Sequence, residues 1–124
     1  MDTKQVGEKL VALCREGKNM EAVDALYAPN IVSIEAVGTP DFPAETRGID
    51  GVRDKGRKWF DNHEVHSATA DGPFPNNDRF AVKYHYDVTA KSGPAAGQRF
   101  NMDEVALYTV KDGKIVREEF FYAM

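Results

Sequence analysis

The N-terminal half of the chain contains three segments in which apolar residues recur at helical spacing. Thr3 to Glu16 has apolar residues three or four positions apart, the period of one helix face. Asn19 is placed to cap a second helix, which Pro29 ends. A third helix is predicted from Gly48 to Asn62, with Asp50 able to cap its start.

Five other segments are rich in β-branched and aromatic residues and predict strands. They are Ile31 to Val37, Glu64 to Ala70, Arg79 to Ala90, Phe100 to Val110 and Ile115 to Tyr122. Gly38 to Arg47 contains two prolines and a glycine, so it is predicted to be a loop that could cover a pocket mouth. The order α-α-β-α-β-β-β-β predicts an α+β fold, with three N-terminal helices on one face of an antiparallel sheet.

The last two predicted strands have a register that can be inferred from the sequence. Asp112-Gly113 favours a two-residue type I′ turn. Counting outward pairs Val110 with Ile115, Leu107 with Glu118, Val105 with Phe120 and Asp103 with Tyr122. Because side chains alternate, one face then holds Asp103, Val105, Leu107, Thr109, Val116, Glu118, Phe120 and Tyr122, and the other holds Glu104, Ala106, Tyr108, Arg117, Glu119 and Phe121. Carboxyl groups on the first, mostly apolar face predict a lined cavity.

Composition narrows the possible functions. A chain of 124 residues is expected to form one domain, residues 1–124, with a core that needs neither disulfide nor metal. The net charge of −4 argues against nucleic-acid binding, and the basic cluster of Arg53, Lys55, Arg57 and Lys58 is interpreted as a solvated helix face. The single cysteine, Cys14, and the lack of a membrane-length apolar run predict a cytoplasmic protein.

The element order and several motifs resemble the nuclear transport factor 2-like superfamily, and within it the SnoaL-like domains. The motifs are RGIDGV at the third helix, EVHSATADGPF, and MDEVALYTVKDGKIVREEFFY at the end of the chain. The resemblance covers essentially the whole chain. It implies a cone in which a curved sheet wraps the helices and leaves a pocket on its concave face, while the convex face forms a homodimer. The activities that it implies range from isomerisation, ring closure, dehydration and epoxide hydrolysis to binding without catalysis.

The steroid isomerase branch of this superfamily gives a residue-by-residue comparison. Its general base on the first strand corresponds to Glu35, but its helix-one phenol corresponds to Leu10. Its late-strand acid falls near Val105, two residues from Asp103. The oxyanion hole is therefore not reproduced, and steroid isomerisation is not expected.

The remaining polar and aromatic residues define a hypothetical site. Glu35, Asp103 and Glu118 are the candidate catalytic residues, and the candidate pocket residues are Trp59, His66, Tyr84, Tyr86, Val105, Phe120 and Tyr122. Burial among aromatic side chains raises a carboxyl pKa, and two close carboxyls separate into an acid and a base. In this hypothesis Glu35 or Asp103 removes a proton from an activated carbon while Glu118 or Tyr122 donates a proton or stabilises charge.

Structural roles for the same residues stay open. Glu118 could pair with an arginine, Asp103 could accept the Tyr122 hydroxyl, and Glu35 could cap a loop. The face of His66 is not settled by its strand pattern, whereas His85 is expected on the convex face. The sequence thus predicts a pocket for a small organic molecule, without cofactor or metal. The protein is either an isomerase, cyclase or dehydratase that uses carboxyl groups, or a dimeric binding domain without catalysis.

Overall fold

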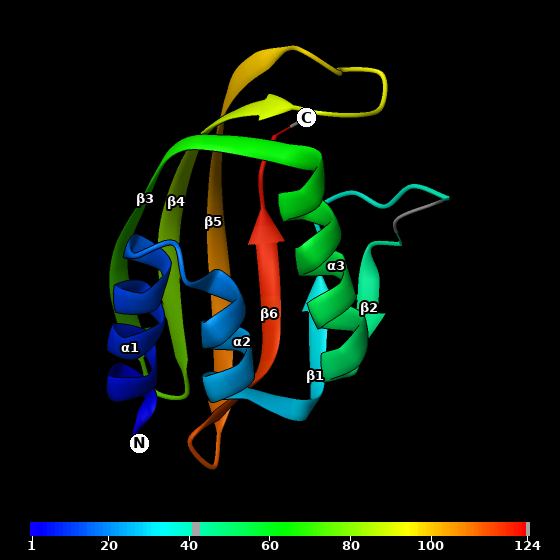
Figure 1. The fold of residues 1–124 in the computed structure, drawn as a ribbon. Helices are drawn as coiled ribbons and strands as arrows, with labels where there is room; N and C mark the ends of the chain where they lie inside the picture. Colours follow the sequence, from blue (N-terminus) through cyan, green and yellow to red (C-terminus); the bar gives the residue numbers. More distant parts are fainter. Residues whose placement is uncertain (41–42, 124) are drawn as a thin grey trace.

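The computed structural model describes residues 1–40 and 43–123 and contains three helices and six strands in that part of the chain (Figure 1). The helices are α1 (Thr3–Arg15), α2 (Asn19–Leu26) and α3 (Ile49–Asn62). The strands are β1 (Tyr27–Ile34), β2 (Glu45–Arg47), β3 (His63–Asn76), β4 (Arg79–Ala90), β5 (Arg99–Lys111) and β6 (Lys114–Phe121). The α+β class is confirmed, and the order gains one strand, β2.

The six strands form one sheet in the order β2-β1-β6-β5-β4-β3. β1 and β6 are parallel and all other neighbours are antiparallel, so the sheet is mixed and the expectation of a purely antiparallel sheet is wrong. The parallel pair arises because α3 and the β3–β5 meander lie between the two strands in sequence and bring the chain back in the same direction. β2 lies at the end of the predicted loop 38–47, of which residues 41 and 42 fall outside the described part.

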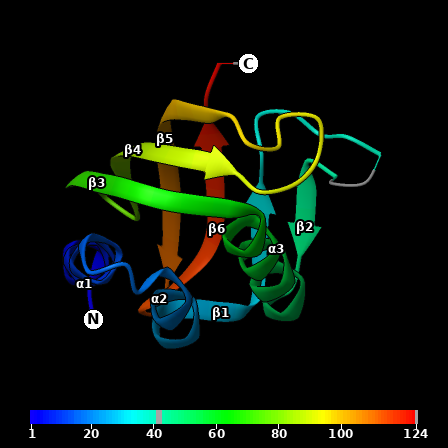
Figure 2. The ribbon, with the colours of Figure 1, turned by 45° about the horizontal axis from the view of Figure 1, so that its top comes forward.

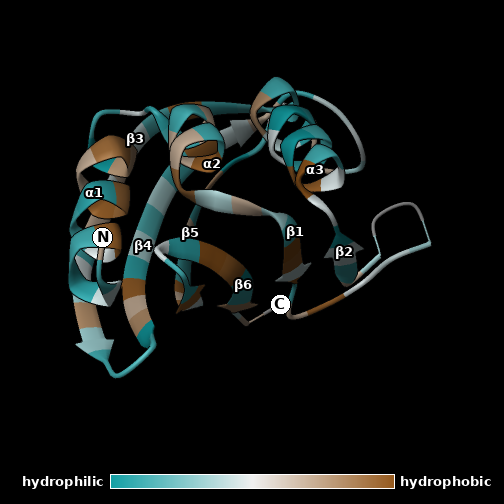
Figure 3. Cartoon of the chain, turned by 90° about the horizontal axis from the view of Figure 1, so that it is seen from below, coloured by the Kyte–Doolittle hydropathy of each residue, from teal (hydrophilic) through white to brown (hydrophobic). Residues whose placement is uncertain are grey.

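All three helices lie on the same face of this sheet (Figure 1). In Figure 2, β3 and β4 run across the direction of β1 and β6, which shows how strongly the sheet twists around the helices. Hydrophobic and hydrophilic residues alternate along the helices (Figure 3), and the buried helix residues include Val6, Leu26 and Val52. The largest fully buried side chains include Leu10, Leu26, Ile31, Phe80 and Ile115.

The predicted helix caps differ from the observed ones. The N-cap of α2 is Lys18 rather than Asn19, and the N-cap of α3 is Gly48, whose φ of 87° favours glycine. Asp50 therefore lies inside the first turn of α3 instead of capping it. In the described residues no helix is long and apolar enough to span a bilayer.

The β5–β6 hairpin has the predicted turn but a different register beyond it. Asp112 and Gly113 both have positive φ, and Val110 pairs with Ile115 as expected. Thr109 then pairs with Arg117, so Val116 is an extra residue on β6. This bulge changes the later pairs to Leu107 with Glu119, Tyr108 with Glu118 and Val105 with Phe121.

Because of the bulge, Glu118 and Phe120 lie on the same side of the sheet as the even-numbered residues of β5, and not as the odd-numbered residues that were predicted. Glu104, Ala106 and Tyr108 share the inner face with them, whereas Asp103, Val105 and Leu107 share the outer face with Phe121. The prediction that Asp103 and Val105 face the pocket is therefore wrong, as is the placement of Tyr108 on the convex face. A register shift of one residue exchanges the two faces of a strand, and counting outward from the turn assumes that no such shift occurs.

Candidate functional site

A pocket of about 660 Å³ lies between the helices and the inner face of the sheet. Side chains from all three helices and from all six strands line it. This volume is typical of sites for small organic molecules. The pocket contains an acidic region near β1 and β6 and an aromatic region near α3 and β4.

Glu118 is the most buried acidic residue of the pocket, with 3% of its surface exposed. Its carboxyl group accepts hydrogen bonds from the Tyr27 hydroxyl and, at 2.7 Å, from the Ser33 hydroxyl. Burial raises the pKa of Glu118, although the Tyr27 hydrogen bond opposes that shift. The partner of Glu118 is thus a pair of hydroxyl groups and not the arginine considered from the sequence.

Lys55 extends from α3 into the pocket beside this buried group. Its ammonium donates hydrogen bonds of 2.6 Å to Ser33 Oγ and 2.7 Å to Glu35 Oε1, and it lies 5.3 Å from the centre of the Phe120 ring. The second oxygen of Glu35 accepts the Tyr122 hydroxyl at 3.0 Å. For Lys55, the interpretation of the basic cluster as a solvated helix face is therefore wrong.

Glu104 is a third carboxyl group in the pocket, and the sequence analysis placed it on the opposite face. It lies on β5 opposite Tyr84 and is partly buried. Burial raises its pKa to about 7, the nearby Glu35 and Glu118 add to the shift, and Lys55 opposes it. A signal did exist in the sequence, because the apolar pair Val110 and Ile115 belongs inside, and Glu104 shares the parity of Val110 on β5.

Aromatic side chains form the opposite wall of the pocket. Trp59 stacks on His63 with 4.4 Å between ring centres and lies 5.3 Å from the Tyr86 ring. The Tyr84 and Tyr108 hydroxyls are 2.8 Å apart, and the Cys14 sulfur lies 3.9 Å from the Tyr84 hydroxyl. Burial raises the pKa of the Cys14 thiol to about 11, so at neutral pH it is a weakly polar wall atom rather than a thiolate.

Seven of the ten site residues predicted from the sequence line this pocket: Glu35, Trp59, Tyr84, Tyr86, Glu118, Phe120 and Tyr122. Three lie outside its lining. Val105 and Asp103 are on the outer face, where Asp103 bonds His85 Nδ1 at 2.7 Å. His66 is exposed on β3 and bonds the Thr89 hydroxyl at 2.6 Å. No role in the pocket is proposed for these three residues.

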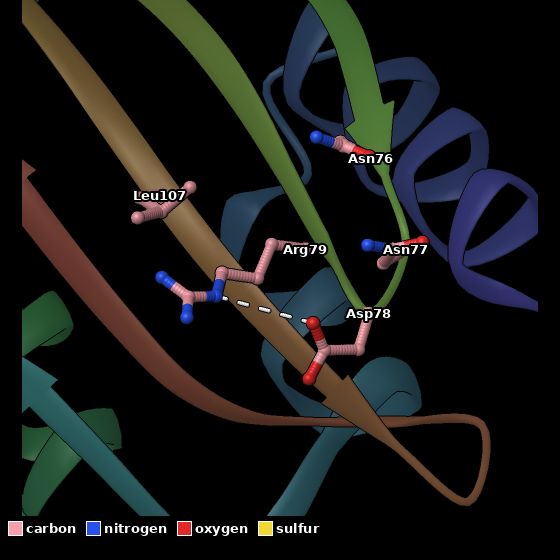
Figure 4. A pocket seen from close by; sticks show the side chains of 5 residues that line it. All are labelled: Asn76, Asn77, Asp78, Arg79 and Leu107. Carbon is pink, nitrogen blue, oxygen red and sulfur yellow. Dashed lines mark ion pairs between the residues drawn. The ribbon is translucent and has the colours of Figure 1, made fainter.

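Two further places were considered as binding sites. In residues 1–40 and 43–123, no group of three or more His, Cys, Asp or Glu side chains is arranged to hold a metal ion. A hollow of about 310 Å³ lies at the β3–β4 turn, where Asp78 and Arg79 form an ion pair of 3.9 Å (Figure 4). Both of these charged side chains are well exposed, so the hollow lacks the buried polar groups that fix a ligand.

Comparisons with known proteins agree with this architecture. The model of the SnoaL-like domain family matches residues 1–122. A crystal structure from Mesorhizobium loti, provisionally named a SnoaL-like polyketide cyclase, is 40% identical, with a TM-score of 0.91 over 98% of this chain and 100% of the other. An NTF2-like protein from Burkholderia thailandensis is 22% identical, with a TM-score of 0.80 over 99% of this chain and 92% of its own.

A more distant structure, from Catenulispora acidiphila, has a ketosteroid isomerase-like fold and was solved in complex with trimethylamine. It is 17% identical, with a TM-score of 0.73 over 98% of this chain and 88% of the other. The search of curated proteins gives no match. The family model and the Mesorhizobium loti structure together show that this chain belongs to the SnoaL-like domain family.

Proposed function

We propose that this protein binds a small, partly apolar carbonyl compound and catalyses proton transfer on it, with isomerisation, cyclisation or dehydration as the outcome. The observation that carries the proposal is the convergence of three glutamates and one lysine in a single aromatic pocket. The chemistry needs no cofactor, because side-chain carboxyl groups can remove and return the proton. The family name alone does not select this activity.

Glu104 is the carboxyl group best suited to exchange a proton with a ligand. Glu35 and Glu118 are each held by two neighbouring side chains. By contrast, no other described residue donates a hydrogen bond to the Glu104 carboxyl group, and its pKa of about 7 makes both of its protonation states accessible at neutral pH. Glu104 would remove a proton from the carbon next to the carbonyl group.

The other two charged groups would prepare the site for this step. The Lys55 ammonium uses two of its three hydrogens for Ser33 and Glu35, so one remains for the negative oxygen that develops on the substrate. Glu35 holds the lysine side chain in the pocket, and the Tyr122 hydroxyl in turn donates a hydrogen bond to Glu35. The aromatic wall around Trp59 would bind the apolar part of the substrate.

The paired state of Glu35 and Glu118 favours a second candidate function, binding without catalysis. Four hydroxyl or ammonium contacts satisfy these two carboxyl groups, which is what a purely structural role requires. In that case the pocket would hold a ligand and Glu104 would only contact it. The two functions differ in whether Glu104 transfers a proton.

A hydrogen-exchange experiment separates these two functions without knowledge of the natural substrate. The probe is 2-tetralone, an apolar ketone with acidic C–H groups, incubated with the protein in D₂O and followed by ¹H NMR. We expect exchange that accelerates as pH rises through about 7, because ionised Glu104 is the base. Glu104→Gln should slow the protein-dependent exchange by about 10²-fold to 10⁴-fold, the usual contribution of a general base.

Asp103→Asn is the matched control, because it removes a carboxyl group at the neighbouring position on the outer face. Its exchange rate should equal that of the wild type. Binding of the probe is followed separately by the fluorescence of Trp59, the only tryptophan. A bound probe whose exchange is no faster than in buffer would refute proton transfer by Glu104 and support the binding function.

We further propose that the protein is cytoplasmic and forms a homodimer through the outer face of the sheet. Its single cysteine has no second cysteine for an internal disulfide, which suits a reducing compartment. Val105 and Phe121 are paired neighbours on the outer face and are 41% and 54% exposed. Such adjacent exposed apolar side chains favour an interface.

A further inference from the structure

The contacts of Lys55 continue beyond the pocket into the buried part of the sheet. Its Nζ lies 2.6 Å from Ser33 Oγ, and Ser33 Oγ lies 2.7 Å from Glu118 Oε1. Ser33 is fully buried and Glu118 is 3% exposed. A continuous hydrogen-bonded path therefore joins the Lys55 amine to the most buried carboxyl group of the pocket.

The hydrogen bonds along this path can be donated in only one direction, from Lys55 towards Glu118. A lysine ammonium can donate but not accept, so the Ser33 oxygen must accept from Lys55. The hydrogen of Ser33 is then free to point at Glu118 Oε1, which accepts it. A proton can move from Lys55 to Ser33 while the Ser33 proton moves to Glu118, and no heavy atom has to change its place.

We propose that Lys55 is a nucleophilic lysine that forms a Schiff base with carbonyl compounds, and that Glu118 takes up its proton through Ser33. The transfer removes one positive and one negative charge, and it neutralises Glu118, which is only 3% exposed and whose charged form burial disfavours. Burial is also the main cause that raises the pKa of Glu118, which suits it to accept a proton. The resulting neutral amine is the form of lysine that attacks a carbonyl carbon.

The covalent step balances with groups already in the pocket. The Nζ lone pair forms a bond to the carbonyl carbon, and the C=O π electrons move to the oxygen. That oxygen leaves as water with one hydrogen from Nζ and one from protonated Glu104, while the remaining nitrogen pair forms the C=N bond. The products are a protonated imine on Lys55, the Glu104 carboxylate and one water molecule, so charge and atoms are conserved.

This inference goes beyond the proposed function, because it makes a covalent bond where that function needs only proton transfer. The two share the pocket but have separate readouts, the adduct on Lys55 and the exchange of C–H hydrogens. Lys55→Arg cannot form an imine yet keeps a positive charge near Glu35. Failure of the adduct with normal exchange would refute this inference alone, and loss of exchange with a normal adduct would refute only the proposed function.

The test is reductive trapping at neutral pH. The protein is incubated with 2-naphthaldehyde and sodium cyanoborohydride, and the modified lysines are identified by mass spectrometry of tryptic peptides. Lys83, exposed on the outer face of β4, is the internal reference. The Lys55 side chain is only 23% exposed, so exposure alone would make Lys83 react faster. We expect the opposite order, with Lys55 labelled faster than Lys83.

Ser33→Ala tests the proton path. We expect the variant to slow the labelling of Lys55 by about 100-fold, the lower range for a lost proton acceptor, while the labelling of Lys83 stays unchanged. Ser33→Thr should restore it, because threonine keeps the hydroxyl group. The titratable groups around Nζ are Glu35, Glu104, Glu118 and Tyr122. Labelling should decrease at low pH, where protonated Glu118 cannot take up the proton, and also at high pH, where ionised Glu104 cannot supply a proton to the leaving oxygen.

Thermal unfolding and the Lys83 rate show whether a variant is folded. If Ser33→Ala does not fold, Glu118→Gln decides, because glutamine can accept the Tyr27 hydrogen bond but cannot take the proton. Slow labelling of Lys55 in folded Glu118→Gln supports the path. Labelling of Lys55 no faster than that of Lys83 in the wild type overturns the proposal. So does an unchanged rate in folded Ser33→Ala or Glu118→Gln.

Discussion

At the scale of single residues, Glu104 combines three conditions that ordinary surface glutamates lack. It is partly buried, it lies in the same pocket as two other carboxyl groups, and the nearby Lys55 only partly offsets their charge. Burial and the two neighbouring carboxyl groups disfavour the ionised form of Glu104, and Lys55 favours it. The cost of ionising it must therefore appear in the pH dependence of folding.

Replacing Glu104 by glutamine should stabilise the protein in a pH-dependent way. The pKa of Glu104 rises from an ordinary 4.5 to about 7 in the folded state, so the folded protein binds more protons than the unfolded chain between these values. The raised pKa of Glu104 contributes at most roughly 3 kcal/mol to the free energy of unfolding. This contribution is fully present below pH 4.5 and is lost as pH rises through 7. Glu104→Gln should avoid that loss, as urea unfolding at pH 5 and pH 8 would show.

Asp103→Asn again provides the comparison for this measurement. The hydrogen bond from His85 lowers the pKa of Asp103, so its ionised form is favoured in the folded state and its removal should not stabilise the protein at pH 8. An equal effect of Glu104→Gln at both pH values would mean that Glu104 titrates normally. It would also remove the main support for Glu104 as a base.

At the scale of elements, the sequence predicted the helices and most strands but not the exact pairing of β5 and β6. Apolar periodicity was sufficient for α1, α2 and α3, and Asp112-Gly113 was sufficient for the turn. Both faces of β5 contain acidic and apolar residues, so the alternation along most of the strand does not identify the inner face, and only the apolar pair Val110 and Ile115 beside the turn indicates it. The choice depends on a single extra residue, Val116, whose placement is fixed by tertiary packing.

The same limit explains which site residues were missed. Glu118 and Tyr122 could be inferred from the alternation of the last predicted strand, and Glu35 from the resemblance to the steroid isomerase branch. Glu104 was assigned to the wrong face with the rest of β5. Lys55 was missed for another reason, because a basic residue on a helix between other basic residues is normally solvated, and here Ser33 and Glu35 accept its hydrogen bonds inside the pocket.

Two glycines in helices test how closely the elements pack. A Cβ atom on Gly7 of α1 would lie 2.7 Å from Cβ of Pro73, which is part of a ring on β3 and cannot move aside. A Cβ atom on Gly56 of α3 would lie 2.9 Å from the sulfur of Met20, a flexible side chain. The two contacts have similar lengths but different partners, so their substitutions should differ in sign.

Gly7→Ala is expected to destabilise the protein by about 1–3 kcal/mol, the usual cost of overpacking. Gly56→Ala should be neutral or stabilising by up to about 1 kcal/mol, because alanine favours the helix and Met20 can change its rotamer. Chemical unfolding measures both variants under identical conditions. A destabilised Gly56→Ala would show that Met20 is held rigidly between α2 and α3.

At the scale of the whole molecule, the sheet separates two surfaces with different chemistry. The inner face and the helices enclose the acidic, aromatic pocket. The outer face carries paired charges, such as Asp87 with Arg99 and Arg117 with Glu119, around the exposed pair of Val105 and Phe121. The proposed pocket chemistry and the proposed association can therefore be tested independently by substitutions on opposite faces of the same strands.

The proposed homodimer gives a prediction at this scale. If the outer faces of two copies pack together, Val105→Glu would bury unpaired carboxylates at the interface, at a cost of several kcal/mol for each ion. Light scattering after size exclusion should then show the wild type at about twice the chain mass of 13.8 kDa and Val105→Glu at the mass of one chain. Val37→Glu is the matched control, because this valine is 45% exposed, against 41% for Val105, but lies at the pocket. A wild type that stays at the mass of one chain at high concentration, or a Val105→Glu variant that still dimerises, would refute an interface at this part of the outer face.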